Sequence, residues 1–314
     1  EAGTALTTGD NNVAIGYAAL DLEDTGTDSV AIGYNALTAQ NNDSANYNVA
    51  IGSSAGAAIT TGIRNTLVGG LAGDALTTGY FNTAVGYSAL STDTLGRLSV
   101  AVGYGALQTQ NQTTGTDVYN VAVGHNAGQA VTTGTGHTLI GGLAGDSLTI
   151  GNDNVAIGLN ALSADVAGSG SVAIGNVALQ DQNFTTATQA YNTAVGRSAA
   201  RDITTGIQNT IVGALAGDAL TDADLNVAMG YLALSADTLG SQSTAIGYKT
   251  LENQNFTTAT DSFNTAVGGG AGRQVTTGTK NTLLGGLAGD AFTTGSDNVA
   301  LGYNALTADT LGSR

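Results

Sequence analysis

Short apolar stretches that each end in a glycine recur along the whole chain. Val or Thr stands three residues before this glycine, and Ile, Val, Leu or Met stands directly before it, so these two side chains share one face of an extended strand. Asn or Ser, and once His137, precedes each stretch as a turn former. Glycine recurs too often for stable helices. The pattern predicts strands at 13–15, 30–32, 49–51 and all equivalent positions, with the Val/Thr and Ile/Val positions facing inward.

The glycines that end these stretches, here called anchor glycines, define coils of mostly 17 residues. From Gly86 onward the spacings 17, 21, 17 and 17 recur, so four consecutive coils, numbered one to four, form a superrepeat of 72 residues. A 17-residue period is too short for a pair of helices and fits one turn of a β-solenoid with two short strands and two turns. The anchors are Gly16, Gly33, Gly52, Gly69, Gly86, Gly103, Gly124, Gly141, Gly158, Gly175, Gly196, Gly213, Gly230, Gly247, Gly268, Gly285 and Gly302.

The repeat covers the chain without an interruption that would indicate a linker. Residues 1–314 are therefore predicted to form a single continuous all-β array, with superrepeats at approximately 12–81, 82–153, 154–225 and 226–297 and partial repeats at both ends. The sequence begins and ends within a coil, and neither end carries an atypical capping repeat. We expect the chain to be a stretch of a longer fibre.

The residue in the middle of each strand suggests how copies of the chain assemble. It points to the opposite face from its two neighbours, and it is Ala in most coils and Leu or Ile in the fourth coil of each superrepeat. A face that met only water would carry polar residues, so we expect this face to pack against another copy of the chain. The predicted interface includes Ala14, Ala31, Ala50, Leu67, Ala84, Leu139, Ile211 and Leu283.

Composition and charge exclude several classes of partner. The chain carries 24 acidic and 8 basic residues, a net charge of −16, so it lacks the basic footprint of a nucleic-acid-binding protein. No apolar run is long enough for a spanning helix, and we expect no membrane insertion. The absence of Cys removes disulfides, zinc clusters and thiol catalysis. With one Met, five Phe and no Trp, the core must be thin and built from small side chains.

The second coil of each superrepeat contains an insertion rich in Asn, Gln and Thr. Protruding polar loops on a rigid scaffold are common binding sites, and the aromatic residue at the end of each insertion offers an apolar contact for a glycan or receptor. The alternative is that these loops only decorate the coil edge. The insertions span 40–47, 108–119, 180–191 and 252–263; their aromatic residues are Tyr47, Tyr119, Tyr191 and Phe263.

Each insertion also contains an Asn-x-Ser/Thr sequon, and no other part of the chain does. In a glycosylating host these asparagines would be acceptors, whereas in a loop rich in Asn and Thr they can also arise by chance. The four asparagines are Asn42, Asn111, Asn183 and Asn255.

No cofactor, metal site or catalytic constellation is predicted. GGLAGDALT at 69–77 resembles a calcium-binding nonapeptide, but such motifs bind in tandem, and here one copy occurs per superrepeat. Asp74 is therefore interpreted as a turn residue, and the column that contains Asp93, Asp165, Asp237 and Asp309 as solvated turns. No His–Asp–Ser set or carboxylate pair departs from the periodicity. We expect that the chain is not an enzyme.

The repeated motifs resemble a known family of fibres. NNVAIGYAAL, SVAIGYNALTA and NTAVGYSALSTDTLG are similar to the VAIG repeats of trimeric autotransporter adhesin heads and to the repeats of long phage or viral tail fibres. The resemblance implies a left-handed parallel β-roll, three chains around one axis, and an extracellular location on a virion or cell surface. A self-cleaving chaperone domain, common in such tail fibres, is absent from this sequence.

Together the residues and the resemblance predict a structural or adhesive fibre shaft that forms a homotrimer. Two alternatives remain open, a self-assembling extracellular filament subunit and a glycan-binding module that uses the insertion loops. The expected partners are further copies of the chain and a host-surface glycan or receptor.

Overall fold

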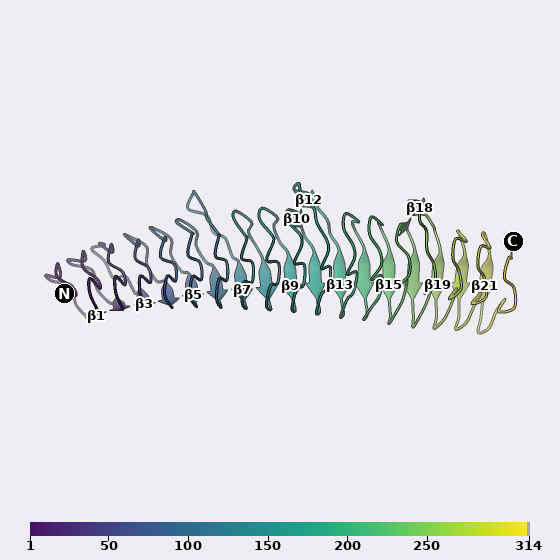
Figure 1. Cartoon of the computed structure of the whole chain (residues 1–314), viewed down its shortest axis with the longest axis horizontal. Coiled ribbons are helices and arrows are strands. Elements are labelled where there is room, and N and C mark those ends of the chain that lie inside the picture. Colours follow the sequence, from purple (N-terminus) through teal and green to yellow (C-terminus); the bar gives the residue numbers. More distant parts are fainter. Residues whose placement is uncertain (313–314) are drawn as a thin grey trace. The chain divides into compact units, whose positions relative to one another are not determined.

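The computed structural model describes residues 1–312, which form a parallel β-solenoid of about 17 coils with no helix. The chain divides into two compact units, Glu1–Asn154 (unit 1) and Val155–Arg314 (unit 2). Each coil contributes one three-residue strand that ends directly before the anchor glycine, and the strands of consecutive coils within a unit lie side by side (Figure 1). The prediction of an all-β solenoid is confirmed; the trimer and the handedness remain predictions.

The strands stand at the positions that the repeat predicts. Unit 1 contains β1 (Val13–Ile15), β2 (Val30–Ile32), β3 (Val49–Ile51), β4 (Thr66–Val68), β5 (Thr83–Val85), β6 (Val100–Val102), β7 (Val121–Val123) and β8 (Thr138–Ile140). Unit 2 contains β9 (Val155–Ile157), β11 (Val172–Ile174), β13 (Thr193–Val195), β14 (Thr210–Val212), β15 (Val227–Met229), β17 (Thr244–Ile246), β19 (Thr265–Val267), β20 (Thr282–Leu284) and β21 (Val299–Leu301). The strand pairings within residues 1–312 are parallel, and equivalent residues face each other, as in Val30↔Val49.

The remainder of each coil is built mainly from turns, so the second strand expected in every coil is not formed. The reason is the backbone after the anchor glycine. In the coil of Gly33, for example, Asn35 and Leu37 both adopt left-handed conformations, with φ of 54° and 49°, which an extended strand excludes. Two pairs of extra two-residue strands occur, each beside an insertion: β10 (Gly168–Ser169) pairs with β12 (Thr188–Gln189), and β16 (Gly240–Ser241) pairs with β18 (Thr260–Asp261).

The two faces of each strand are the reverse of those predicted. The middle residue of the strand lies in the solenoid interior, whereas the Val/Thr and Ile/Val positions on either side of it face outward and are partly exposed. The assignment of an oligomer interface to the middle residues is therefore wrong, because a second copy cannot reach side chains that are enclosed by their own coil. Of these residues, Ala31, Ala50, Leu67, Ala84, Leu139, Ile211 and Leu283 have no exposed surface, and Ala14, in the first coil, is half-buried.

The interior explains why Leu or Ile replaces Ala in every fourth coil. In coils one and two, Ala in the strand is accompanied by a buried Leu four residues after the anchor, such as Leu90. In coils three and four that position is mostly Gly. The Leu or Ile in the strand of coil four occupies the space that this leaves in both coils. A Cβ added at Gly56 or at Gly73 would lie 2.8 Å from Leu67. The core is thus filled by compensating large and small residues, which keeps its packing dense.

A buried ladder of asparagines joins the coils just before the strands. The Asn65 amide N–H donates to Asn48 Oδ1 (2.9 Å), and Asn48 Nδ2 donates to the Gly62 carbonyl (2.8 Å). The same two bonds recur at Asn82, Asn209 and Asn281. Each side chain therefore satisfies one backbone donor and one backbone acceptor that burial would otherwise leave unpaired.

The anchor glycines allow the closest approach between coils. Gly86 has φ of 141°, a conformation that is essentially restricted to glycine, and a Cβ added there would lie 2.3 Å from the carbonyl oxygen of Gly103. The same relation holds between Gly33 and Gly52. Glycine at this position is therefore a requirement for stacking rather than a compositional preference.

We predict that Gly86→Ala lowers the free energy of unfolding by at least about 1–3 kcal/mol from backbone strain alone. Gly269→Ala is the matched control, because Gly269 has no positive φ and its added Cβ would meet only the Tyr248 carbonyl oxygen, at 4.0 Å. The control should change the free energy of unfolding by less than about 1 kcal/mol. Chemical denaturation measures both values, and equal values would contradict this role of the anchor.

Candidate functional site

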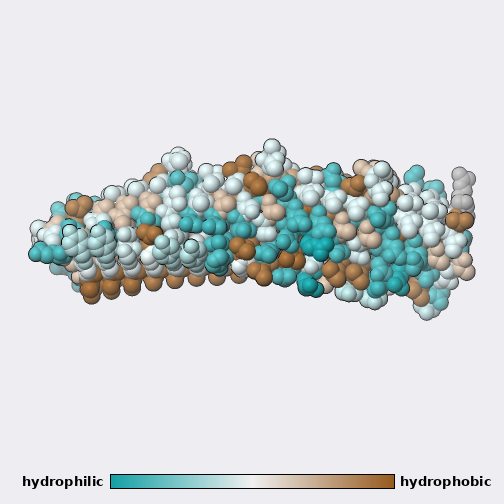
Figure 2. All heavy atoms as spheres, in the orientation of Figure 1, coloured by the Kyte–Doolittle hydropathy of each residue, from teal (hydrophilic) through white to brown (hydrophobic). Residues whose placement is uncertain are grey.

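The outward side chains of the strands form an apolar strip, here called the outer face. Its two rows are Val or Thr at the first strand position and mostly Ile or Val at the third. In unit 1, Ile15 is 58 % exposed and Ile51 37 % exposed, and most other members of the rows are half-buried. Figure 2 shows hydrophobic atoms in a continuous row along the lower edge of unit 1. A contiguous apolar surface of this kind is typical of an interaction site.

One edge of the outer face carries a ladder of exposed tyrosines directly after the anchor glycines. Tyr17 stacks on Tyr34 with ring centroids 5.6 Å apart, and Tyr231 stacks on Tyr248 at 5.9 Å. Tyr87, Tyr104 and His125 form a longer stack, with centroid distances of 5.7 and 5.3 Å. These residues therefore pack on one another from coil to coil.

The opposite edge is a corner formed by the residue five positions before each anchor. This residue is left-handed in every coil where it is not glycine, with φ between 51° and 62°. The predicted ligand-contact residues all lie on this corner, on separate superrepeats, so the structure does not bring them together. Tyr47, Tyr119, Tyr191 and Phe263 are 53, 60, 54 and 49 % exposed.

Each insertion is held by a buried carboxylate of the preceding coil. Asp165 Oδ1 accepts the amide N–H groups of Gly168 (3.1 Å) and Phe184 (3.0 Å), and Oδ2 accepts Gln182 Nε2 (2.6 Å). Burial raises the pKa of Asp165, and the hydrogen bonds oppose that shift. Asp93 and Asp237 make the same contacts and are also fully buried. Their interpretation as solvated turns is therefore wrong; only Asp309, in the last coil, is exposed.

The glutamine of the second coil extends this network to the asparagine ladder. Gln182 Nε2 also donates to Ser171 Oγ (3.1 Å), and its Oε1 accepts Asn192 Nδ2 (2.9 Å). The second coil carries Ser in place of Asn in all four superrepeats, because the glutamine uses the space and the hydrogen bonds there. That recurring Ser is the signal in the sequence from which the network can be found.

The sequon asparagines lie at the base of the insertions. Asn183 and Asn255 are exposed, and Asn42 and Asn111 are half-buried. Thr94 Oγ1 donates to Asn111 Oδ1 (3.2 Å), and Thr238 Oγ1 donates to Asn255 Oδ1 (3.2 Å). These two asparagines therefore continue a column of threonines that link neighbouring coils, and glycosylation remains a prediction.

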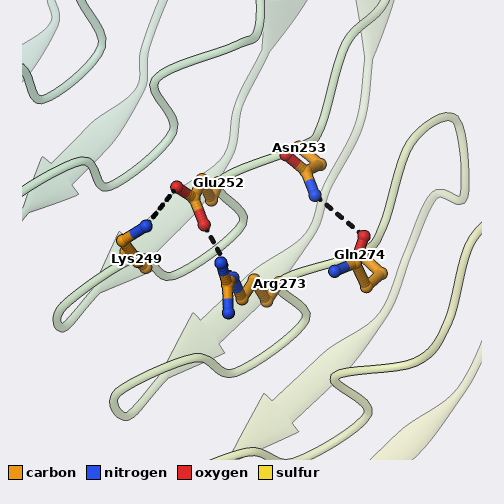
Figure 3. Close-up of polar contacts among 5 residues, drawn as sticks. All are labelled: Lys249, Glu252, Asn253, Arg273 and Gln274. Carbon is orange, nitrogen blue, oxygen red and sulfur yellow. Dashed lines mark hydrogen bonds and ion pairs between the residues drawn. The ribbon is translucent and has the colours of Figure 1, made fainter.

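A charged cluster in unit 2 is internally paired. Glu252 accepts Lys249 Nζ (2.8 Å) and Arg273 Nε (2.7 Å), beside a hydrogen bond from Asn253 to Gln274 (Figure 3). Burial raises the pKa of Glu252, but the two cations outweigh burial and the pKa lies below its usual value. In residues 1–312 no group of three or more His, Asp or Glu side chains is placed to hold a metal ion.

His137 occupies one position of the asparagine ladder. It is buried, it accepts the amide N–H of Asn154 at Nδ1 (3.3 Å), and its own amide N–H donates to Asn120 Oδ1 (2.9 Å). Burial lowers its pKa to about 4 from an ordinary value of 6.5. His137 is thus a neutral structural residue at physiological pH.

We predict that unit 1 loses stability as pH falls from about 6.5 to 4, because the unfolded chain binds a proton at His137 that the folded chain excludes. A pKa difference of this size corresponds to about 3 kcal/mol. Urea titrations of the wild type and of His137→Asn, across this range, measure the effect. The difference in stability between the two should move in favour of His137→Asn as pH falls; a difference that is independent of pH would contradict the prediction.

The described part of the chain, being free of helices, contains none that is long and apolar enough to cross a membrane. Comparison with known protein families, curated proteins and solved structures finds no match.

Proposed function

We propose that the chain is a structural fibre shaft that assembles with further copies of itself through the outer face, most simply as a homotrimer. The observation that carries this proposal is the apolar strip, which runs through successive coils while the interior of each coil is already filled by its own Ala and Leu residues. The solenoid therefore has no internal use for the outward Ile and Val side chains. Covering them with the same strip of another copy would remove apolar surface from water, at about 25 cal/mol per Å².

The physical properties of the chain suit an extracellular rod on a virion or cell surface. Stacked coils joined by ladders of hydrogen bonds give stiffness, and a net charge of −16 limits non-specific association. The resemblance to adhesin heads and tail fibres supports the same role. A filament subunit is the alternative, and end-to-end polymers seen by electron microscopy would favour it.

We predict that Val85→Lys, on the outer face, reduces the molar mass in solution from a multiple of 30.9 kDa to that of one chain. The charge would have to be desolvated without a partner in the assembly. Thr78→Lys adds the same charge at an exposed position away from the strands and should leave the molar mass unchanged. Sedimentation velocity measures both. A wild-type chain that is a stable monomer would overturn the proposal.

A second candidate function is glycan binding through the corner aromatics at the ends of the insertions. Its support is that an exposed, apolar ring recurs at Tyr47, Tyr119, Tyr191 and Phe263, although the left-handed backbone there accepts Asp, Gln or Lys in other coils. The backbone therefore does not require the ring.

For this candidate we predict that replacing all four rings by Gln, which occupies the same corner at Gln208 and Gln242, abolishes binding on a glycan array while the molar mass is unchanged. Stacking of a sugar on each ring is the interaction removed. Binding that survives the replacement would exclude these residues as the contact.

A further inference from the structure

Four residues of unit 1 depart together from the superrepeat at one corner. Arg64 and Phe81 lie five residues before their anchors, and Tyr80 and Arg97 lie six residues before theirs. Other superrepeats carry mainly small or acidic residues here: Gly136, Gln208 and Lys280 for Arg64; Asp10, Asn152, Asp224 and Ser296 for Tyr80; Asn11, Asp153, Leu225 and Asp297 for Phe81; Thr27, Ser169 and Ser241 for Arg97. A joint departure of this kind in a regular array indicates a local role.

The four side chains form one connected cluster, here called the arginine corner. The Arg64 guanidinium lies over the Phe81 ring, 5.3 Å from its centroid, and the Phe81 ring meets Tyr80 edge-to-face at 5.1 Å. The Arg97 guanidinium covers Tyr80 at 4.5 Å. Cation–π contacts of this geometry hold a guanidinium in place while leaving its N–H groups free to donate.

The two arginines differ in what they offer a ligand. Arg97 is mostly buried, pairs with Asp117 at 3.7 Å, and is so close to Gly115 of the insertion that a Cβ there would lie 2.2 Å from Nη2. It therefore supports the loop. Arg64 is exposed, and its guanidinium makes no hydrogen bond or ion pair within residues 1–312. A guanidinium that is already oriented and unpaired is suited to bidentate contact with a carboxylate or sulfate.

Apolar ring surface flanks Arg64 on both sides along the corner. Tyr47 lies one coil before it and is 53 % exposed, and Phe81 lies one coil after it and is 42 % exposed. Neighbouring coils are about 4.8 Å apart, a step close to the length of one pyranose residue. A cation between two exposed rings matches an anionic group attached to a ring with apolar C–H faces.

We propose that the arginine corner binds an acidic saccharide, with its carboxylate or sulfate on Arg64 and a sugar ring against Tyr47 or Phe81. The site sharpens the second candidate function by giving one of the corner aromatics a ligand class, and it rests on the corner being accessible in the assembled shaft. The chain has eight basic residues and a net charge of −16, so its overall electrostatic field repels anions. Binding of an anion therefore requires a local cationic site such as the arginine corner.

The test is titration calorimetry of the intact assembly with an oligogalacturonate, a heparin oligosaccharide and a neutral malto-oligosaccharide. Oligogalacturonate carries only carboxylates, whereas heparin carries both carboxylates and sulfates, so binding of heparin alone would indicate a sulfate contact. The third probe tests whether charge is needed. We expect at least one acidic probe to bind, more weakly at high salt, and the neutral probe not to bind. Failure of both acidic probes, or equal binding of the neutral one, would overturn the proposal.

The variants are taken from equivalent coils so that folding is preserved. Arg64→Gln introduces the residue found at Gln208 and should weaken binding about tenfold or more, because a charge-assisted bidentate contact is lost. Lys280→Gln removes the same charge at the equivalent position in another superrepeat and should change affinity less than about twofold. Equal losses in the two variants would indicate general electrostatics and reject the site.

Phe81→Leu, which introduces the residue found at Leu225, provides a second measurement if Arg64→Gln does not fold. It should weaken binding of the acidic probe without changing the charge. An affinity that is unchanged both here and in Tyr47→Gln would contradict the stacking contact. Sedimentation velocity of each variant should still give the wild-type molar mass. Loss of binding with an intact assembly therefore separates failure of this site from failure of the shaft proposal.

Discussion

The structure depends on one constraint, that each coil makes its backbone hydrogen bonds to the next coil in register. Because neighbouring strands lie about 4.8 Å apart, no side chain can stand where two coils meet most closely, and the anchor position is glycine in all seventeen coils. The same constraint places equivalent residues in columns. Once in columns, asparagines share hydrogen bonds, tyrosines stack, and threonine hydroxyls donate to the next carbonyl.

The four-coil superrepeat follows from how this constraint is met in the interior. A buried carboxylate in coil one is linked to a glutamine in coil two, and the glutamine is linked to a serine and to the asparagine of the next coil, so that the four side chains form one polar network. Buried Leu residues such as Leu162 and Leu179 fill the interior of the same two coils. Coils three and four have apolar residues instead at the carboxylate position, for example Ile203 and Leu220. Removing one member would leave a buried polar group unpaired, so the residues of the network must change together. The insertions therefore recur once per superrepeat.

Strand positions, coil boundaries and register could be predicted from the sequence, because each is marked by a local signal, the β-branched residue or the glycine. The inside and outside of the strand could not. Alternation places Val30 and Ile32 on one face and Ala31 on the other, but which face is enclosed depends on the width of the coil. That width is determined by the left-handed turns at residues such as Leu37, which no local pattern marked. Tyr47 is exposed, as a contact residue at the end of an insertion must be. The supporting Asp165 was not recognised, since a single buried carboxylate resembles a solvated turn residue until its partner Gln182 is known.

The proposed function follows from which side of each strand is enclosed by the coil. Because Ala and Leu residues already fill the interior, the β-branched residues on either side of each middle residue lie outside, where they form an apolar strip that another copy can cover. The most direct test is solvent paramagnetic relaxation of methyl groups in the intact wild-type chain. The account predicts that the outward methyl groups of Val85 and Val102 are shielded from a soluble paramagnetic agent nearly as well as those of the interior Leu90. Relaxation of the outward methyl groups as fast as that of the exposed Thr78 methyl group would show an uncovered face and contradict the account.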